Sequence, residues 1–182
     1  MKKLLSCLLC LLFLTGCGKE QSQENTLLQL RSKLQECGCT FSCGITVDYG
    51  DCIYTFGMNC AYAPGDGLQF TVIEPESIMD ISGRITEGKL RFDDVSLYFD
   101  LLADGMLSPV SAPWVVMQAI TGGYLHTTGR EEALLRVTLR DSYREDAFTV
   151  ELWLKEEIPV SAEIYWEGRR ILTLEIEDFV IQ

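Results

Sequence analysis

The stretch Phe41–Tyr62, FSCGITVDYGDCIYTFGMNCAY, alternates between apolar and polar side chains in two runs that meet at Gly50-Asp51. A period of two is typical of a strand that buries one face, and a Gly/Asp turn between two such runs predicts a β-hairpin. The apolar positions are Phe41, Cys43, Ile45, Val47 and Tyr49 in the first run, and Cys52, Tyr54, Phe56, Met58, Cys60 and Tyr62 in the second. We therefore expect a hairpin with one buried face.

Working outward from this hairpin, nine further segments have the composition of strands and are separated by short turn signals. They predict strands over residues 68–72, 81–86, 89–92, 95–99, 124–127, 133–140, 148–154, 160–166 and 172–176. The turn signals are Pro64–Gly67, Gly88, Asp93-Asp94, Gly129 and Glu167-Gly168.

Two segments have a helical pattern instead. Residues Thr26–Glu36 carry Leu27, Leu30 and Leu34 at positions i, i+3 and i+7, which predicts an amphipathic helix. Residues Trp114–Ile120 are apolar nearly all round, which indicates a helix with few solvent contacts. Pro109, Pro113 and Gly122-Gly123 bracket this second helix and predict sharp ends.

The order is thus helix, about six strands, helix, about five strands, with connections of hairpin length. It predicts an α+β fold built on one long antiparallel sheet of about 10–11 strands that is apolar on one face. A sheet of this size must curl or close, so we expect a long curled sheet whose apolar concave face the two helices cover. One domain over residues 26–182 accommodates it.

The beginning of the chain reads as a secretory signal peptide. Met1-Lys2-Lys3 is positive, Leu4–Leu14 is a short apolar run, and small residues lead to Cys17. The run is shorter than the roughly 20 residues that span a bilayer. Leu14-Thr15-Gly16-Cys17 resembles the lipobox of bacterial lipoproteins, which implies cleavage before Cys17 and acylation of its thiol, measurable as palmitate incorporation. We expect a signal peptide over 1–16, a polar, flexible lipidated tether over 17–25, and a location on the extracytoplasmic face of the cell membrane.

Charge argues against nucleic acid as a partner. The chain has 15 basic and 27 acidic residues. Lys2 and Lys3 leave with a cleaved signal peptide, so 13 basic residues remain against 27 acidic ones, a net charge of −14. Such a surface repels nucleic acid and anionic headgroups, and no basic cluster offsets it.

Several phrases resemble a known superfamily. Phe70–Glu76 followed by Ile81-Ser82-Gly83, and Leu90-Arg91-Phe92 followed by Leu107-Ser108-Pro109, are similar to LolA/LolB-like lipoprotein carriers. Among these they look most like the GerS-like lipoproteins of Gram-positive, often spore-forming, bacteria. The resemblance implies an incomplete barrel with helices at its mouth and a cavity that takes acyl chains. It carries no catalytic signature.

Five cysteines follow Cys17, all early in the chain: Cys37, Cys39, Cys43, Cys52 and Cys60. Their odd number leaves at least one free or paired with another molecule. Disulfides, buried free thiols and a thiolate metal site are all compatible with their spacing, and we favour disulfides because they persist outside the membrane. A two-residue turn at Gly50-Asp51 would make Cys43 and Cys60 diagonal neighbours on one face of the sheet. Diagonal neighbours are marginal for a disulfide bond, so we favour a bond from Cys37 or Cys39 to a strand cysteine over that pair.

The sequence offers no catalytic constellation, so we expect no enzyme, cofactor or metal. His126 is the only histidine and has no nucleophile motif beside it, which points to a surface or sheet-edge residue. The acidic pairs fall at turns or on outward strand faces, where they are solvated.

The resulting hypothesis is a lipid-anchored protein that buries a hydrophobic ligand, a lipid or an acyl chain, between sheet and helices. The alternative is a structural or interaction lipoprotein of the envelope or of spore germination, with a collapsed core and an envelope protein as partner. The residues expected to line a cavity are Phe70, Val72, Phe92, Trp114, Met117, Val150, Leu152, Ile164 and Trp166.

Overall fold

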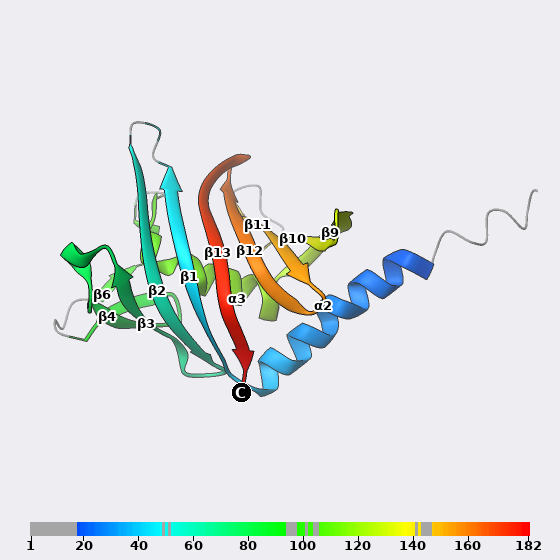
Figure 1. The fold of residues 1–182 in the computed structure, drawn as a ribbon, viewed down its shortest axis with the longest axis horizontal. Helices are drawn as coiled ribbons and strands as arrows, with labels where there is room; N and C mark the ends of the chain where they lie inside the picture. Colours follow the sequence, from blue (N-terminus) through cyan, green and yellow to red (C-terminus); the bar gives the residue numbers. More distant parts are fainter. Residues whose placement is uncertain are drawn as a thin grey trace, which may run out of the picture.

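The computed structural model describes residues 18–48, 50, 52–93, 98–100, 102–103, 106–140, 142 and 147–182. A large curled sheet forms most of this part of the chain, with one helix at its end and one in its hollow (Figure 1). The helices are α2 (Gly18–Glu36) and α3 (Ala112–Gly122), with short 3-10 turns η2 (Glu76–Ile78) and η3 (Pro109–Ser111). The strands are β1 (Cys39–Asp48), β2 (Ile53–Ala63), β3 (Gly67–Glu74), β4 (Ser82–Thr86), β5 (Lys89–Phe92), β6 (Tyr98–Asp100), β7 (Leu102–Ala103), β8 (Met106–Leu107), β9 (Tyr124–Glu131), β10 (Leu134–Arg140), β11 (Thr149–Lys155), β12 (Ile158–Trp166) and β13 (Arg169–Ile181).

The described strands of the sheet form two antiparallel meanders that join through β1 and β13. Their order is β6-β5-β4-β3-β2-β1-β13-β12-β11-β10-β9, while β7 and β8 form a separate pair. Cys43 of β1 lies opposite Met58 of β2 on one side and Ile176 of β13 on the other. The predicted α+β fold, with six strands before the mid-chain helix and five after it in one open antiparallel sheet, is confirmed.

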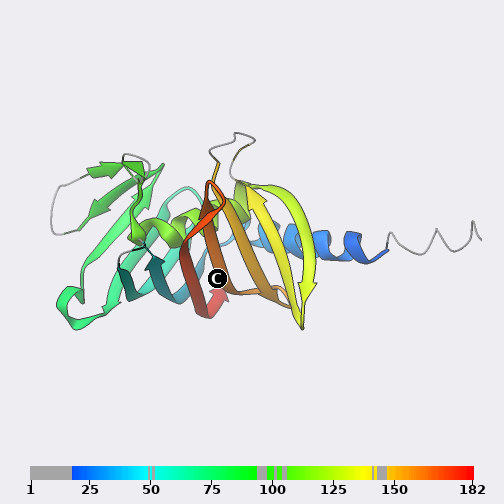
Figure 2. The same cartoon turned by 90° about the horizontal axis from the view of Figure 1, so that it is seen from above.

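This topology explains why α3 covers the concave face. Strands β6 and β9 occupy the two edges of the sheet, yet they precede and follow α3 along the chain. The connection between them must therefore cross the sheet from edge to edge. Helix α3 lies in that crossing and contacts β3, β10, β12 and β13. Seen from above, α3 lies in the hollow of the curled sheet (Figure 2).

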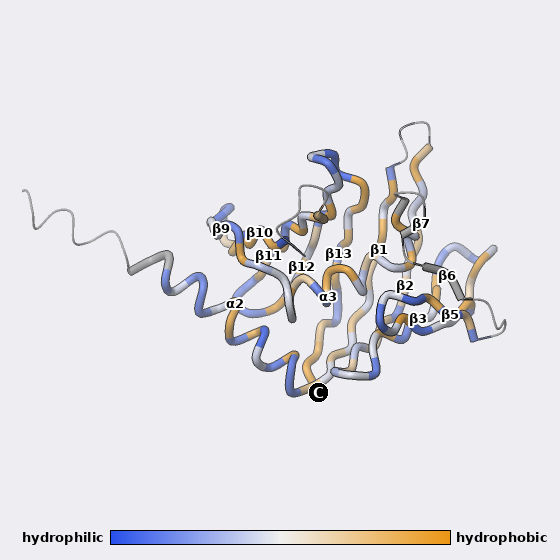
Figure 3. Tube along the Cα trace, turned by 180° about the vertical axis from the view of Figure 1, so that it is seen from behind, coloured by the Kyte–Doolittle hydropathy of each residue, from blue (hydrophilic) through white to orange (hydrophobic). Residues whose placement is uncertain are grey.

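Burial alternates along the strands as the period of two predicts. In β11 the odd positions are partly exposed, whereas Val150, Leu152 and Leu154 are buried. Buried side chains from β1–β5, β10–β13, α2 and α3 form one continuous core on the concave side. Hydrophobic residues recur along the strands and in α3, whereas the outlying turns of α2 are hydrophilic (Figure 3). We call the buried side of the sheet the inner face and the opposite side the outer face.

Helix α2 begins earlier than the sequence predicted. Residues 18–25, expected to form a flexible spacer, are its first two turns. Lys, Glu and Gln have good helix propensity, so a polar segment rich in them extends a helix that tertiary contacts already hold. These turns carry no buried residue among the side chains that the structure describes, whereas Leu27, Leu30 and Leu34 are fully buried. The second half of α2 packs against α3 and β9.

One other expectation, about a turn, is corrected. Gly129 lies within β9, opposite Arg136, and the turn to β10 comes later, at Glu132-Ala133. β9 is an edge strand, and its residues are exposed or half-exposed. Asp48 pairs with Ile53, which is the register that the predicted Gly50-Asp51 turn requires, and Gly50 has a positive φ of 89°. No helix in the described part of the chain is long and apolar enough to cross a membrane.

Candidate functional site

The inner face brings together the residues that were expected to line a cavity. All of them belong to the core or pack against it, and they come from β3, β5, α3, β11 and β12. Phe92, Trp114 and Trp166 are half-buried at its rim. Two ring contacts extend this apolar surface: Phe70 meets Phe92 edge to face, and Phe148 lies 4.7 Å from Trp166 between ring centroids.

The other six of these residues are tightly packed in this conformation. No more than 2% of each side chain is exposed: Phe70, Val72, Met117, Val150, Leu152 and Ile164. Phe70 also belongs to the set around a hollow of the outer face over β1–β3, but on the inner face these six side chains leave almost no accessible surface for a ligand. An acyl chain could therefore reach these residues only if α3 moved away from the sheet, and whether they line a ligand site stays a prediction.

Helix α3 is a discrete unit with sharp ends. Pro113 stands in its first turn, where a missing backbone N–H costs nothing. At the other end the Thr121 hydroxyl donates to the Met117 carbonyl, and the Gly123 N–H donates to the Ala119 carbonyl. The following carbonyls have no partner within the helix, as at any helix C-terminus, and need donors from elsewhere.

Helix α2 supplies these donors. Arg31 Nε donates to the Ile120 carbonyl at 2.6 Å, and an Arg31 guanidinium nitrogen donates to the Gly123 carbonyl at 2.7 Å. Gln35 Nε2 donates to the Thr121 carbonyl at 2.7 Å. Burial lowers the pKa of Arg31, but a guanidinium stays charged and also complements the negative end of the α3 dipole. We call Arg31 and Gln35 the α2 clamp.

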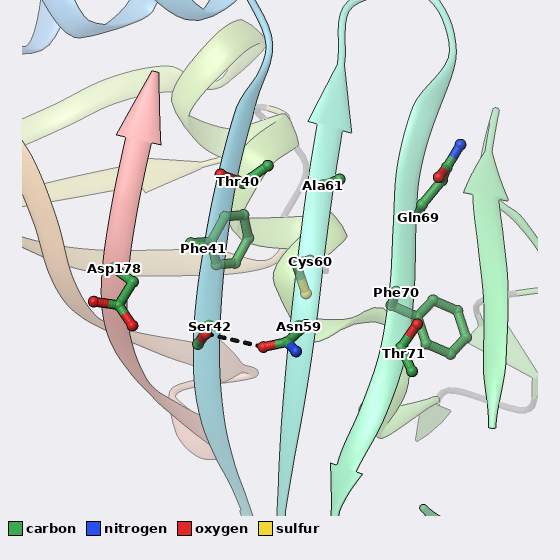
Figure 4. Close-up of a pocket in the computed structure, with 10 residues that line it drawn as sticks. All are labelled: Thr40, Phe41, Ser42, Asn59, Cys60, Ala61, Gln69, Phe70, Thr71 and Asp178. Carbon is green, nitrogen blue, oxygen red and sulfur yellow. Dashed lines mark hydrogen bonds between the residues drawn. The ribbon is translucent and has the colours of Figure 1, made fainter. Parts of the chain in front are cut away.

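The outer face carries open hollows that are lined by polar and apolar atoms alike. One, of about 370 Å³, lies over β1, β2 and β3, where Ser42 donates a hydrogen bond to Asn59 across the strands (Figure 4). Another, of about 380 Å³, is lined by Trp153, Glu163 and other outward residues of β9–β13. Burial and a hydrogen bond to Glu163 raise the pKa of Tyr165 to about 12. These hollows have none of the depth that a lipid chain requires.

The early cysteines occupy different environments. Cys39, Cys43 and Cys60 are buried on the inner face of β1 and β2, Cys37 is half-buried, and Cys52 is exposed. The close pair is Cys43 and Cys60, whose sulfur atoms lie 3.9 Å apart, not a pair that includes Cys37 or Cys39 as the sequence favoured. All five are free thiols in the structure, and the expected disulfides stay a prediction.

The residues with catalytic potential lie apart from the inner face. His126 is exposed on the edge strand β9, as predicted for a surface or sheet-edge histidine. Glu131, Glu132, Glu175 and Glu177 are exposed, in agreement with solvated acids. Within the described ranges, no three His, Cys, Asp or Glu side chains are arranged to hold a metal ion. Cys17, the predicted lipidation site, lies outside the described residues.

Sequence reasoning missed the α2 clamp. Arg31 follows Leu30 on a helix whose leucines were the only signal used, and a basic residue there reads as part of the solvated face. Its partners are backbone carbonyls about ninety residues away, as the separation of 89 for Ile120 shows. Backbone acceptors carry no sequence signature, so only the fold could reveal this contact.

Comparison with known proteins finds distantly similar structures and no matching sequence. No protein-family model and no curated protein matches this sequence. The structure is similar to an uncharacterized conserved protein from Thermus thermophilus, with a TM-score of 0.49 and 12% identity, over 89% of this chain and 88% of that chain. It is also similar to a LolA superfamily protein from Nitrosomonas europaea, with a TM-score of 0.47 and 14% identity, over 85% of this chain and 93% of that chain. A third is a putative outer membrane lipoprotein-sorting protein domain from Vibrio parahaemolyticus, with a TM-score of 0.45 and 11% identity, over 86% of this chain and 91% of that chain.

These similarities concern the course of the chain alone. The open antiparallel sheet, the N-terminal helix and the mid-chain helix are nevertheless the architecture that the LolA/LolB-like resemblance implies, and the chain itself displays them. The GerS-like part of that resemblance stays a prediction.

Proposed function

We propose that this protein binds the acyl chain of a lipid between the inner face and α3, without covalent chemistry. The observation that supports this proposal most is the way α3 is held. An apolar helix covers an apolar sheet face, and the clamp holds its C-terminal carbonyls through hydrogen bonds from α2. Apart from these bonds at one end, α3 is held by apolar packing against the sheet, which an acyl chain that enters in its place would replace.

The free-energy cost of exposing the buried side chains of α3 can be compared with the free energy that an acyl chain contributes when it is buried in their place. Val116, Met117 and Ile120 of α3 are almost fully buried. Exposing three apolar side chains costs roughly 5–9 kcal/mol, at about 1.5–3 kcal/mol each. An acyl chain that buries about 12 methylene groups in their place contributes roughly 10 kcal/mol, at about 0.8 kcal/mol per group. The contribution of a long acyl chain is thus of the same order as the cost of exposing these three side chains, whereas the contribution of a chain of four or five carbons is smaller.

Binding of a fluorescent long-chain fatty acid to delipidated protein tests this proposal. We expect saturable binding of one chain per molecule, weakened about tenfold in Met117→Gln. A buried amide that faces an acyl chain without a partner costs about 1–3 kcal/mol. Gln118→Ala is the matched control, because Gln118 is the exposed neighbour on the same helix. Absence of saturable binding to the wild type would leave the interaction lipoprotein as the better account.

We further propose that Cys17 carries the lipid anchor, with residues 17–25 as the tether between membrane and domain. The exposed first turns of α2 suit this role, since they make no buried contact among their described side chains. We expect Cys17→Ala to abolish incorporation of radiolabelled palmitate in a bacterial host and to leave an uncleaved precursor. Undiminished label in this variant would exclude Cys17 as the acylated residue. Cys52→Ala, which removes an exposed thiol, is the control.

A further inference from the structure

The inner face of the β1–β2 hairpin holds three thiols in neighbouring positions. Phe41 of β1 pairs with Cys60 of β2, and the residues two positions away on either side of Phe41 are Cys39 and Cys43. Both are therefore diagonal neighbours of Cys60 on the same face. Strand twist brings one diagonal of an antiparallel pair closer than the other. In this hairpin the close diagonal is Cys43–Cys60, with a sulfur-to-sulfur distance of 3.9 Å.

These two thiols are sealed from solvent once the sheet has formed. Only 3% of Cys43 and 4% of Cys60 is exposed. The hydrogen bond to Cys43 and burial raise the pKa of Cys60 well above its ordinary value. Because the thiolate is the reactive form, Cys60 reacts poorly in the folded protein, and burial shields both sulfur atoms from reagents in solution. A bond between them must therefore form while the hairpin is still open, and it is protected afterwards.

We propose that Cys43 and Cys60 form an intrachain disulfide during folding, in exchange with a disulfide donor outside the membrane. One cysteine thiolate attacks a sulfur of the donor and releases a donor thiol. The second cysteine thiolate then attacks the mixed disulfide and releases the other donor thiol. Two electrons pass to the donor, and the two cysteine protons end on the released thiols. The bond shortens the sulfur-to-sulfur distance to about 2.05 Å through rotation of both side chains and a small approach of the strands.

Peptide mapping after oxidative refolding tests this assignment. The purified protein is reduced, unfolded, and refolded in a mixture of reduced and oxidised glutathione, then alkylated and digested with chymotrypsin. Cleavage after Phe41, Tyr49, Tyr54, Phe56 and Tyr62 places Cys43, Cys52 and Cys60 on separate peptides. We expect a cross-linked pair that joins the Cys43 and Cys60 peptides, about 2 Da lighter than the sum of their thiol forms. Alkylation of both residues, or a bond from either one to Cys37 or Cys39, would overturn the assignment.

Thermal unfolding supplies an independent measurement. A disulfide that closes a loop of roughly 15–20 residues should raise the melting temperature of the oxidised protein by roughly 5–10 °C over the reduced form. We expect this difference to vanish in Cys43→Ala and in Cys60→Ala and to persist in Cys52→Ala. A difference of the same size in Cys43→Ala would contradict the proposal. Since peptide mapping uses the wild type, the assignment stays testable even if a buried alanine variant does not fold.

Discussion

Gly67→Ala is expected to lose roughly 2–5 kcal/mol of folding free energy and to unfold at lower denaturant concentration than the wild type. Gly67 begins β3 with a φ of +90°, which costs a residue with a Cβ about 1–2 kcal/mol. A Cβ built there would lie 2.1 Å from the carbonyl oxygen of Ile85 in β4. Because that contact is with backbone, β3 and β4 must separate, and such overpacking adds about 1–3 kcal/mol.

Gly65→Ala is the matched control for this experiment. Gly65 also has a positive φ, of +83°, but a Cβ built there meets no atom within 4 Å. We expect this variant to lose only the backbone contribution of about 1–2 kcal/mol. Equal losses in the two variants would mean that the close approach of β3 to β4 does not contribute, and that the register of this part of the sheet is wrong.

Arg31→Ala is expected to cost roughly 2–3 kcal/mol and, under the proposed binding of an acyl chain, to accelerate exchange of that chain several-fold. A hydrogen bond from a charged donor contributes about 1.5–3 kcal/mol, and its loss leaves the carbonyls at the end of α3 without donors. The first effect appears as a fall in the melting temperature. The second appears in stopped-flow displacement of a fluorescent fatty acid, because the open position of α3 becomes more populated.

Arg31→Lys separates charge from geometry in the clamp. Lysine keeps the positive charge near the helix C-terminus but cannot reproduce the planar arrangement of donors that reaches two carbonyls. We expect an intermediate loss of stability and an intermediate exchange rate. If Arg31→Ala lowers the melting temperature but leaves exchange unchanged, the clamp stabilises the fold without controlling access to the inner face.

The alternating pattern allowed the strands and the curled sheet to be predicted, because burial of one face imposes a period of two wherever the chain runs along the core. Val150, Leu152 and Leu154 are all buried as that pattern requires. The same pattern says which face is inside but not which strand lies next to which. The pairing of β1 with β13 joins the first and the last strand along the chain and became visible only in the fold.

The candidate site could be predicted only as a collection of apolar residues. The sequence indicates that Trp114–Ile120 is an isolated apolar helix, and the crossing from β6 to β9 explains why it fills the hollow. It does not indicate Arg31, whose acceptors are backbone atoms, or the packing that leaves Met117 and Ile164 almost without exposed surface. The close cysteine pair depended on a strand twist that spacing alone does not convey.

Quenching of single tryptophans by a brominated fatty acid tests the central claim most directly, because bromine quenches an indole only at contact range. Trp114, in the first turn of α3, packs against the core, whereas Trp153 points from the outer face, where its indole N–H donates to Glu131. One double variant, Trp153→Phe with Trp166→Phe, retains Trp114, and another, Trp114→Phe with Trp166→Phe, retains Trp153. We expect saturable quenching of Trp114 and none of Trp153. Quenching of Trp153 alone, of both residues equally, or of neither would contradict binding of an acyl chain between α3 and the inner face.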